Sequence, residues 1–111
     1  MTSAQITIQE KLCQFINEYE DDRYCLLELL RFWGRHPCTR FSQLVIIHAL
    51  DSRRPYVERA LRYLINMGVV RTHIDNNLPV YSLTEEESLR SPVLNVAKLD
   101  WGQWQLVLGR I

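Results

Sequence analysis

The sequence has little glycine, proline or cysteine, and each scarcity narrows the class of protein. Four glycines and four prolines in 111 residues leave no room for low-complexity segments, and no internal repeat is visible. Three cysteines without paired spacing favour free thiols over a disulfide framework. No apolar run reaches about 18 residues, and the first residues lack a secretory signal pattern. We therefore expect one cytoplasmic domain over residues 1–111, without a membrane span.

The motifs of the common enzyme classes are also missing. The sequence has no glycine-rich phosphate loop, no nucleophile motif and no carboxylate pair set against a base. Cys25, His36, Cys38 and His48 are ligand types that Zn²⁺ prefers, but their spacing matches no familiar metal site. We expect neither an enzyme nor a cofactor or metal, whereas thiol sensing by Cys13, Cys25 or Cys38 stays open.

The charge is distributed unevenly along the chain, although the formal net charge is zero. Residues 1–30 carry two basic and six acidic side chains, and residues 72–111 carry three basic and five acidic ones. The central residues 31–71 carry eight arginines against two acidic side chains. A basic centre between acidic flanks indicates a polyanionic partner, and the planar arginine fork suits phosphate or guanine better than lysine does.

Apolar residues at helical spacing predict three helices in the first half of the chain. An amphipathic helix over residues 5–20 is followed by a strongly apolar helix over residues 24–33, which Gly34 and Pro37 end. Ser42 or Thr39 caps a third helix.

A fourth helix, predicted over residues 52–67, lies within the arginine-rich centre of the chain. We expect Ser52 to cap it, Pro55 to fall in its first turn and Gly68 to end it. Its apolar face consists of Val57, Ala60, Leu61 and Leu64. Its opposite face consists of Arg59, Arg62 and Asn66. Strands at residues 69–74 and 80–83 follow, joined by a turn through Asn76 and Asn77.

The last third of the chain predicts a terminal helix within residues 85–110. Thr84 to Glu87 reads as a capping box, and Ser91 followed by Pro92 is a second helix start signal. An apolar stripe continues along this helix to Trp101, Trp104 and Leu108. So much apolar surface either closes over the core or meets a second subunit, and we favour a dimer interface.

The order of elements resembles a winged helix-turn-helix domain over residues 24–84, a mainly α fold with a small β-hairpin. The pattern Ser-x4-Val-x-Arg-Ala-Leu-x2-Leu-x3-Gly-Val-Val, from Ser52 to Val70, is similar to the recognition-helix signature of small bacterial and archaeal regulators. The segment Tyr81-Ser82-Leu83-Thr84 resembles the return strand of their wing. The additional helices at residues 5–20 and 85–110 resemble the dimerising helices of MarR- or PadR-type regulators.

The resemblance implies a dimeric transcriptional regulator that binds double-stranded DNA in a sequence-specific way. The helix at 52–67 would lie in the major groove, with residues 69–83 as the wing. The expected DNA contacts are Arg40, Ser52, Arg53, Arg54, Tyr56, Arg59, Arg62, Arg71 and His73. The expected dimer contacts are Ile8, Leu12, Phe15, Trp101, Trp104 and Leu108. A small-molecule effector stays open, with no residue cluster marking its pocket.

The sequence also allows a function other than DNA binding. Winged helices also serve as protein-interaction modules, in which case Trp101 and Trp104 would form the working surface and the arginines would only confer solubility.

Within the DNA-binding hypothesis, Arg54, Tyr56 and Arg59 are the best candidates for base contacts. Pro55 leaves the geometry of the first turn, and with it the direction of Arg53 and Arg54, undetermined.

Overall fold

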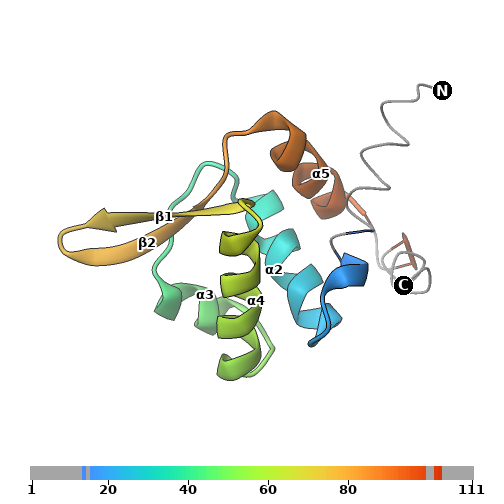
Figure 1. Ribbon diagram of the computed structural model, residues 1–111, viewed down its shortest axis with the longest axis horizontal. Helices are drawn as coiled ribbons and strands as arrows, with labels where there is room; N and C mark the ends of the chain where they lie inside the picture. The colour runs from blue at the N-terminus through green and yellow to red at the C-terminus, as the bar shows by residue number, and fades with distance from the viewer. Residues whose placement is uncertain (1–13, 15, 100–101, 104–111) are drawn as a thin grey trace.

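The computed structural model describes residues 14, 16–99 and 102–103, and it has the predicted order of elements (Figure 1). The helices are α2 (Arg23–Arg35), α3 (Gln43–Ala49), α4 (Arg54–Asn66) and α5 (Glu87–Ala97), and the strands are β1 (Val70–Asp75) and β2 (Leu78–Leu83). In Figure 1 the hairpin extends to one side of the helices, as a wing does. None of the described helices is long and apolar enough to cross a membrane.

Helix α2 is the central apolar helix of the core. Its N-cap is Asp22, whose carboxylate accepts a hydrogen bond from the Cys25 amide at 3.1 Å. Of the two predicted terminators, Gly34 is wrong, because α2 continues to Arg35, and Pro37 is confirmed, because the helix is capped at His36 directly before it. Gly34 is instead the place where α2 touches α5, since a Cβ there would lie 2.5 Å from the Ala97 Cβ. The glycine therefore serves close helix packing rather than termination.

The helix-turn-helix pair is formed by α3 and α4. Ser42 caps α3 by accepting from the Val45 amide at 3.3 Å, which confirms one of the two predicted caps. The predicted apolar face of α4 is buried, comprising Val57, Ala60, Leu61 and Leu64. Gly68, at φ +81°, ends the helix in the left-handed region as expected.

The cap predicted for α4 is wrong. The N-cap position is Arg53, which makes no side-chain cap hydrogen bond. Ser52 instead donates its hydroxyl to the Glu28 carboxylate at 2.8 Å, and the same carboxylate accepts from the Asp51 amide at 3.0 Å. A carboxylate on α2 therefore holds the turn before α4 through charge-assisted hydrogen bonds. Pro55 lies in the first turn of α4, as predicted.

The wing is a hairpin with a two-residue loop. Asn76 and Asn77 have φ of 51° and 66°, the signs that a type I′ turn requires, which confirms their assignment as turn residues. An isolated antiparallel bridge joins Phe41 to Tyr81, so the segment before α3 lies beside β2. Val70 and Leu83 are buried and fix the base of the hairpin on the core.

Helix α5 begins differently from the prediction. Thr84 is buried and accepts from the Glu86 amide at 3.2 Å, and Glu86 is an N-cap without a side-chain hydrogen bond, so there is no capping box. Pro92 lies inside a continuous helix rather than at a second start. Of the helix predicted over residues 5–20, the described residues 14 and 16–18 are helical, and Ile16 and the following Tyr19 are buried in the core. All six residues assigned to the dimer interface lie outside the described residues.

Candidate nucleic-acid interface

The outer face of α4 presents most of the predicted DNA contacts. Burial of the opposite face leaves Arg53, Arg54, Tyr56, Arg59 and Arg62 exposed on the surface. We call this set the α4 outer face. Since a helix of about 10–12 Å diameter fits the major groove of B-DNA, a convex, cationic helix surface of this kind has the shape and charge that duplex DNA requires.

Arg59 is fixed by two neighbours. Asp21, which precedes α2, accepts hydrogen bonds from Nε and, at 3.4 Å, from Nη2 of the Arg59 guanidinium. The Tyr56 ring lies against the same guanidinium, with its centroid 4.9 Å from Cζ. The hydrogen bond with Asp21 raises the pKa of Arg59, and the same bond lowers the pKa of Asp21, so both groups stay charged.

This arrangement leaves part of Arg59 available. Asp21 occupies the Nε side of the guanidinium, and the edge formed by Nη1 and Nη2 still carries unused N–H donors. An arginine can contact O6 and N7 of a guanine with one edge while a carboxylate holds the other. Asp21 and Tyr56 therefore reduce the rotamer freedom that Arg59 would lose on binding.

Arg54 has a weaker intramolecular partner. Its Nε lies 3.6 Å from the Glu58 carboxylate, one helical turn away, and the Arg54 side chain is 63% exposed. Glu58 also accepts a hydrogen bond from Gln43 of α3 at 3.1 Å. A surface pair of this kind contributes about 0–1 kcal/mol, so it does not prevent Arg54 from contacting another group.

Ser52 does not belong to this surface in the way the sequence suggested. Its hydroxyl is directed to Glu28 and it is half-buried. A phosphate at this point would have to compete with a carboxylate that already accepts from Ser52. The first turn of α4 also offers few backbone donors, because Pro55 has no N–H and the Tyr56 amide donates to the Arg53 carbonyl at 3.0 Å.

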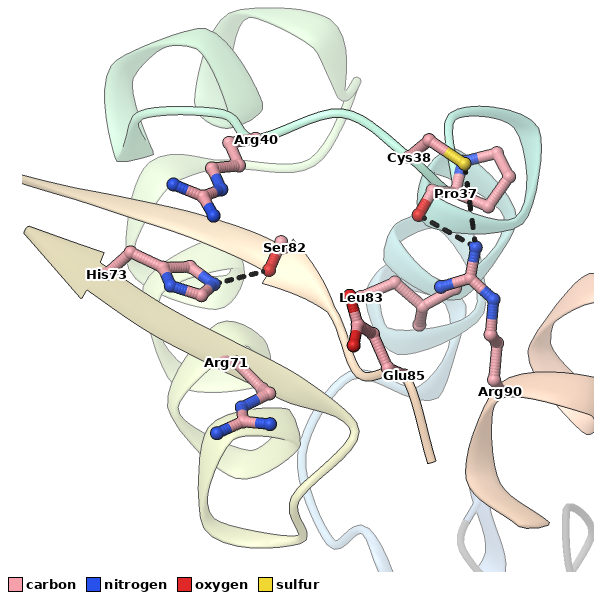
Figure 2. Close-up of a pocket in the computed structure, with 9 residues that line it drawn as sticks. All are labelled: Pro37, Cys38, Arg40, Arg71, His73, Ser82, Leu83, Glu85 and Arg90. Carbon is pink, nitrogen blue, oxygen red and sulfur yellow. Dashed lines mark hydrogen bonds between the residues drawn. The ribbon is translucent and has the colours of Figure 1, made fainter. Parts of the chain in front are cut away.

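The remaining predicted contacts lie on a second surface. Because Phe41 pairs with Tyr81, strand alternation places Arg40 on the same sheet face as Ser82, Arg71 and His73. These four residues line one pocket, shown in Figure 2. The other sheet face carries the buried Val70 and Leu83 and packs on the core together with α4. The outer sheet face and the α4 outer face therefore point away from the core in different directions.

Two residues of these surfaces were not recognised in the sequence. Asp21 is one of six acidic residues among residues 1–30, and Arg90 belongs to no motif although it lines the pocket. Neither has a local signal, since Asp21 is 38 residues from Arg59 and Arg90 is 53 residues from Pro37, to whose carbonyl it donates. Only the tertiary fold brings them to their sites.

The cysteine and histidine residues considered as metal ligands do not assemble in the described part of the chain. Cys25 is buried in α2, where burial raises the pKa of its thiol, whereas Cys38 and His48 are exposed. Among the described residues, no three histidine, cysteine or acidic side chains are close enough to hold a metal ion.

Comparisons with known proteins place this geometry in a fold family. No protein-family model and no curated protein matches the sequence. Among solved structures, the chain is similar to the crystal structure of a MepR mutant from a multidrug-resistant S. aureus clinical isolate, with a TM-score of 0.58. The match covers 100% of this chain and 85% of that chain at 18% identity. MepR is a MarR-family winged helix-turn-helix regulator.

This similarity confirms the predicted fold class. The chain has a mainly helical, MarR-like winged helix-turn-helix fold with a two-stranded antiparallel hairpin. The second helix of the helix-turn-helix pair is α4, and the wing is formed by β1 and β2.

Proposed function

We propose that this chain is a small dimeric transcriptional regulator that binds double-stranded DNA in a sequence-specific way. The observation that carries the proposal is the α4 outer face, in which an exposed arginine surface occupies the second helix of a helix-turn-helix pair. In that fold the N-terminal residues of the second helix reach base edges in the major groove. The fold similarity to a MarR-family regulator supports the same function.

The residues of the α4 outer face have separable roles in this proposal. Arg53 and Arg54 stand at the N-terminal end of α4, where side chains reach the groove floor or the flanking phosphates. Arg59 reads guanine with the edge that Asp21 leaves open. Arg62, one turn further along, contacts a phosphate. A bidentate arginine contributes about 1–3 kcal/mol of discrimination between bases.

The proposed dimer uses the helices at both ends of the chain. Its support is the apolar spacing of the six assigned residues, which lie outside the described part of the structure. A twofold dimer would present two α4 helices to half-sites about 34–36 Å apart, so the binding site would be palindromic. Sedimentation equilibrium with and without a palindromic duplex measures the mass of the DNA complex and the mass of the free protein.

Retardation of genomic DNA fragments by the full chain tests the proposal. Arg53→Gln with Arg54→Gln should weaken binding by about 100-fold or more, because two direct DNA contacts are lost. The matched control is Arg35→Gln with Lys98→Gln, which removes the same charge from exposed positions outside α4 and should bind almost as well as the wild type. Equal retardation by the two double variants would reject α4 as the DNA-binding element.

A second function has a specific observation in its favour. The wing tip carries exposed apolar side chains, Ile74 at 70% and Leu78 at 64% exposure, together with an acidic residue, Asp75. Such a tip suits a protein partner better than a phosphate backbone. A chain that is monomeric in solution and does not retard DNA even at low salt would support a protein-interaction module instead.

A further inference from the structure

The outer sheet face forms a pocket separate from the α4 outer face, and its lining includes Arg40, Arg71 and His73, which the winged-helix resemblance implies as DNA contacts. It has a volume of about 390 Å³ and is open to solvent. We call it the sheet-face pocket, and its polar lining is Arg40, Arg71, His73, Ser82, Glu85 and Arg90. Pockets of about 300–1,000 Å³ accommodate small molecules, and this one lies near the lower limit.

The side chains reach the pocket from three parts of the chain. Arg71 and His73 come from β1, Arg40 comes from the segment beside β2, and Arg90 comes from α5 on the opposite side (Figure 2). His73 Nε2 lies 2.8 Å from the Ser82 hydroxyl, which orients the imidazole on the sheet. The lining thus combines cationic groups from elements on both sides of the pocket.

Arg90 is held without losing its charge. It donates to the carbonyl oxygens of Thr84 and Pro37, each at 3.1 Å, and to the Cys38 sulfur at 3.7 Å. None of these acceptors is a carboxylate. Three hydrogen bonds use three of the five N–H donors of a guanidinium, so two remain for a ligand.

The charge of the pocket is not balanced by the protein. Among the described residues, the two ion pairs involve Arg54 and Arg59, both on α4. Arg40, Arg71 and Arg90 have no ion-pair partner in that part of the chain, and Glu85 is the one carboxylate in the lining. With His73 counted as neutral, the lining has an excess of two positive charges.

We propose that the sheet-face pocket binds a small molecule that carries a phosphate monoester. A phosphate monoester carries about 1.5 to 2 negative charges at pH 7, which matches the excess in the lining, and it has three terminal oxygen acceptors. A phosphodiester or a single carboxylate carries one charge and leaves the pocket unbalanced. Guanidinium groups bind phosphate oxygens with pairs of N–H donors. The proposal does not depend on DNA binding by α4.

Methyl phosphate and dimethyl phosphate are matched probes for this site. Each is titrated into the ¹⁵N-labelled full chain at constant ionic strength, and amide shifts are followed by NMR. Methyl phosphate should produce saturable shifts centred on Arg71, His73 and Ser82, and dimethyl phosphate should bind at least about 10-fold more weakly because it lacks one charge. Equal affinities for the two esters would overturn the charge argument.

Charge-neutral variants separate the pocket from the DNA interface. Arg40→Gln with Arg71→Gln should abolish saturable binding of methyl phosphate, whereas Arg53→Gln with Arg54→Gln should leave it unchanged. Circular dichroism and the amide spectrum away from the pocket establish that each variant is folded. If the first double variant is unfolded, Arg40→Gln and Arg71→Gln alone should each weaken binding several-fold.

Two results would reject the proposal. One is saturable methyl phosphate binding that survives in folded Arg40→Gln, Arg71→Gln protein. The other is a loss of duplex DNA binding in that variant, combined with no saturable shift by methyl phosphate in the wild type. The second result would assign the pocket to the DNA backbone.

Discussion

The α4 outer face and the sheet-face pocket contain the same side chain in two different settings. On α4 the arginines project from a convex helix, and two of them have carboxylate partners, Asp21 and Glu58. In the pocket they line a concave surface, and Arg90 is held by carbonyl groups and a thiol. A convex surface with oriented arginines suits a groove, whereas a concave surface with unbalanced charge suits a small anion. Shape and partners, rather than charge alone, distinguish the two.

The largest effect should come from the core that both surfaces share. Leu61 is 2% exposed and seats α4, so Leu61→Ala should lower the free energy of unfolding by about 2–5 kcal/mol. As the temperature rises, the variant should lose binding of DNA and binding of methyl phosphate together, at its lowered unfolding midpoint. The control is Leu78→Ala at the 64% exposed wing tip, which should change stability by less than about 0.5 kcal/mol. Similar losses in the two variants would contradict the shared core.

A smaller effect should disturb one surface and spare the other. In Gly34→Ala the new Cβ would lie 2.5 Å from the Ala97 Cβ and 2.7 Å from the Val93 carbonyl oxygen, so α5 must shift. Overpacking of this kind costs about 1–3 kcal/mol. Because α5 carries Arg90, the affinity for methyl phosphate should fall. The affinity for DNA should persist at temperatures below the unfolding midpoint of the variant. Adding Ala97→Gly should recover part of the stability, and no recovery would mean that the contact is not the cause.

The smallest change in stability should come from Asp21→Asn, which removes the carboxylate partner of Arg59 and keeps a side-chain oxygen that can accept from the Asp22 amide, now at 2.9 Å. Without the carboxylate, Arg59 can turn to a phosphate, so the log–log salt slope of DNA binding should steepen by about 0.9 and discrimination between sequences should fall. The control Asp75→Asn removes the same charge from the wing tip and should leave discrimination unchanged. Equal discrimination by the wild type and Asp21→Asn would show that Asp21 does not position Arg59.

The same ion pair predicts a pH dependence of stability. Arg59 lowers the pKa of Asp21 in the folded state, so the folded chain releases this proton at a lower pH than the unfolded chain does. The pair therefore stabilises the fold above the unfolded pKa of an aspartate, and this contribution is lost as the pH falls through the lowered folded value. The thermal unfolding midpoints of the wild type and of Asp21→Asn are measured from neutral to acidic pH. The difference between the two midpoints should shrink as the pH falls. A constant difference would contradict the pair.

Local patterns in the sequence predicted the elements that depend on local chemistry. The buried face of α4, the Ser42 cap, the left-handed Gly68 and the turn at Asn76 and Asn77 are confirmed. Each is determined by spacing or backbone conformation within a few residues.

The errors occur where a distant residue competes with a local signal. Serine is a common helix cap, but the Ser52 hydroxyl donates to the Glu28 carboxylate on α2. Gly34 is a common helix terminator, but in α2 it lies one residue before the end, where α5 packs so closely that only a small residue fits. The pocket could not be predicted, because it depends on the pairing of Phe41 with Tyr81 and on the reach of Arg90.

The most direct test of the account measures two ligands against two variants. Arg53→Gln with Arg54→Gln and Arg40→Gln with Arg71→Gln each remove two arginines, and each is tested for binding to duplex DNA and to methyl phosphate. We predict that the first variant loses DNA binding and keeps methyl phosphate binding, and that the second loses methyl phosphate binding and keeps most DNA binding. Equal losses of both ligands in both variants would contradict the existence of two separate basic surfaces.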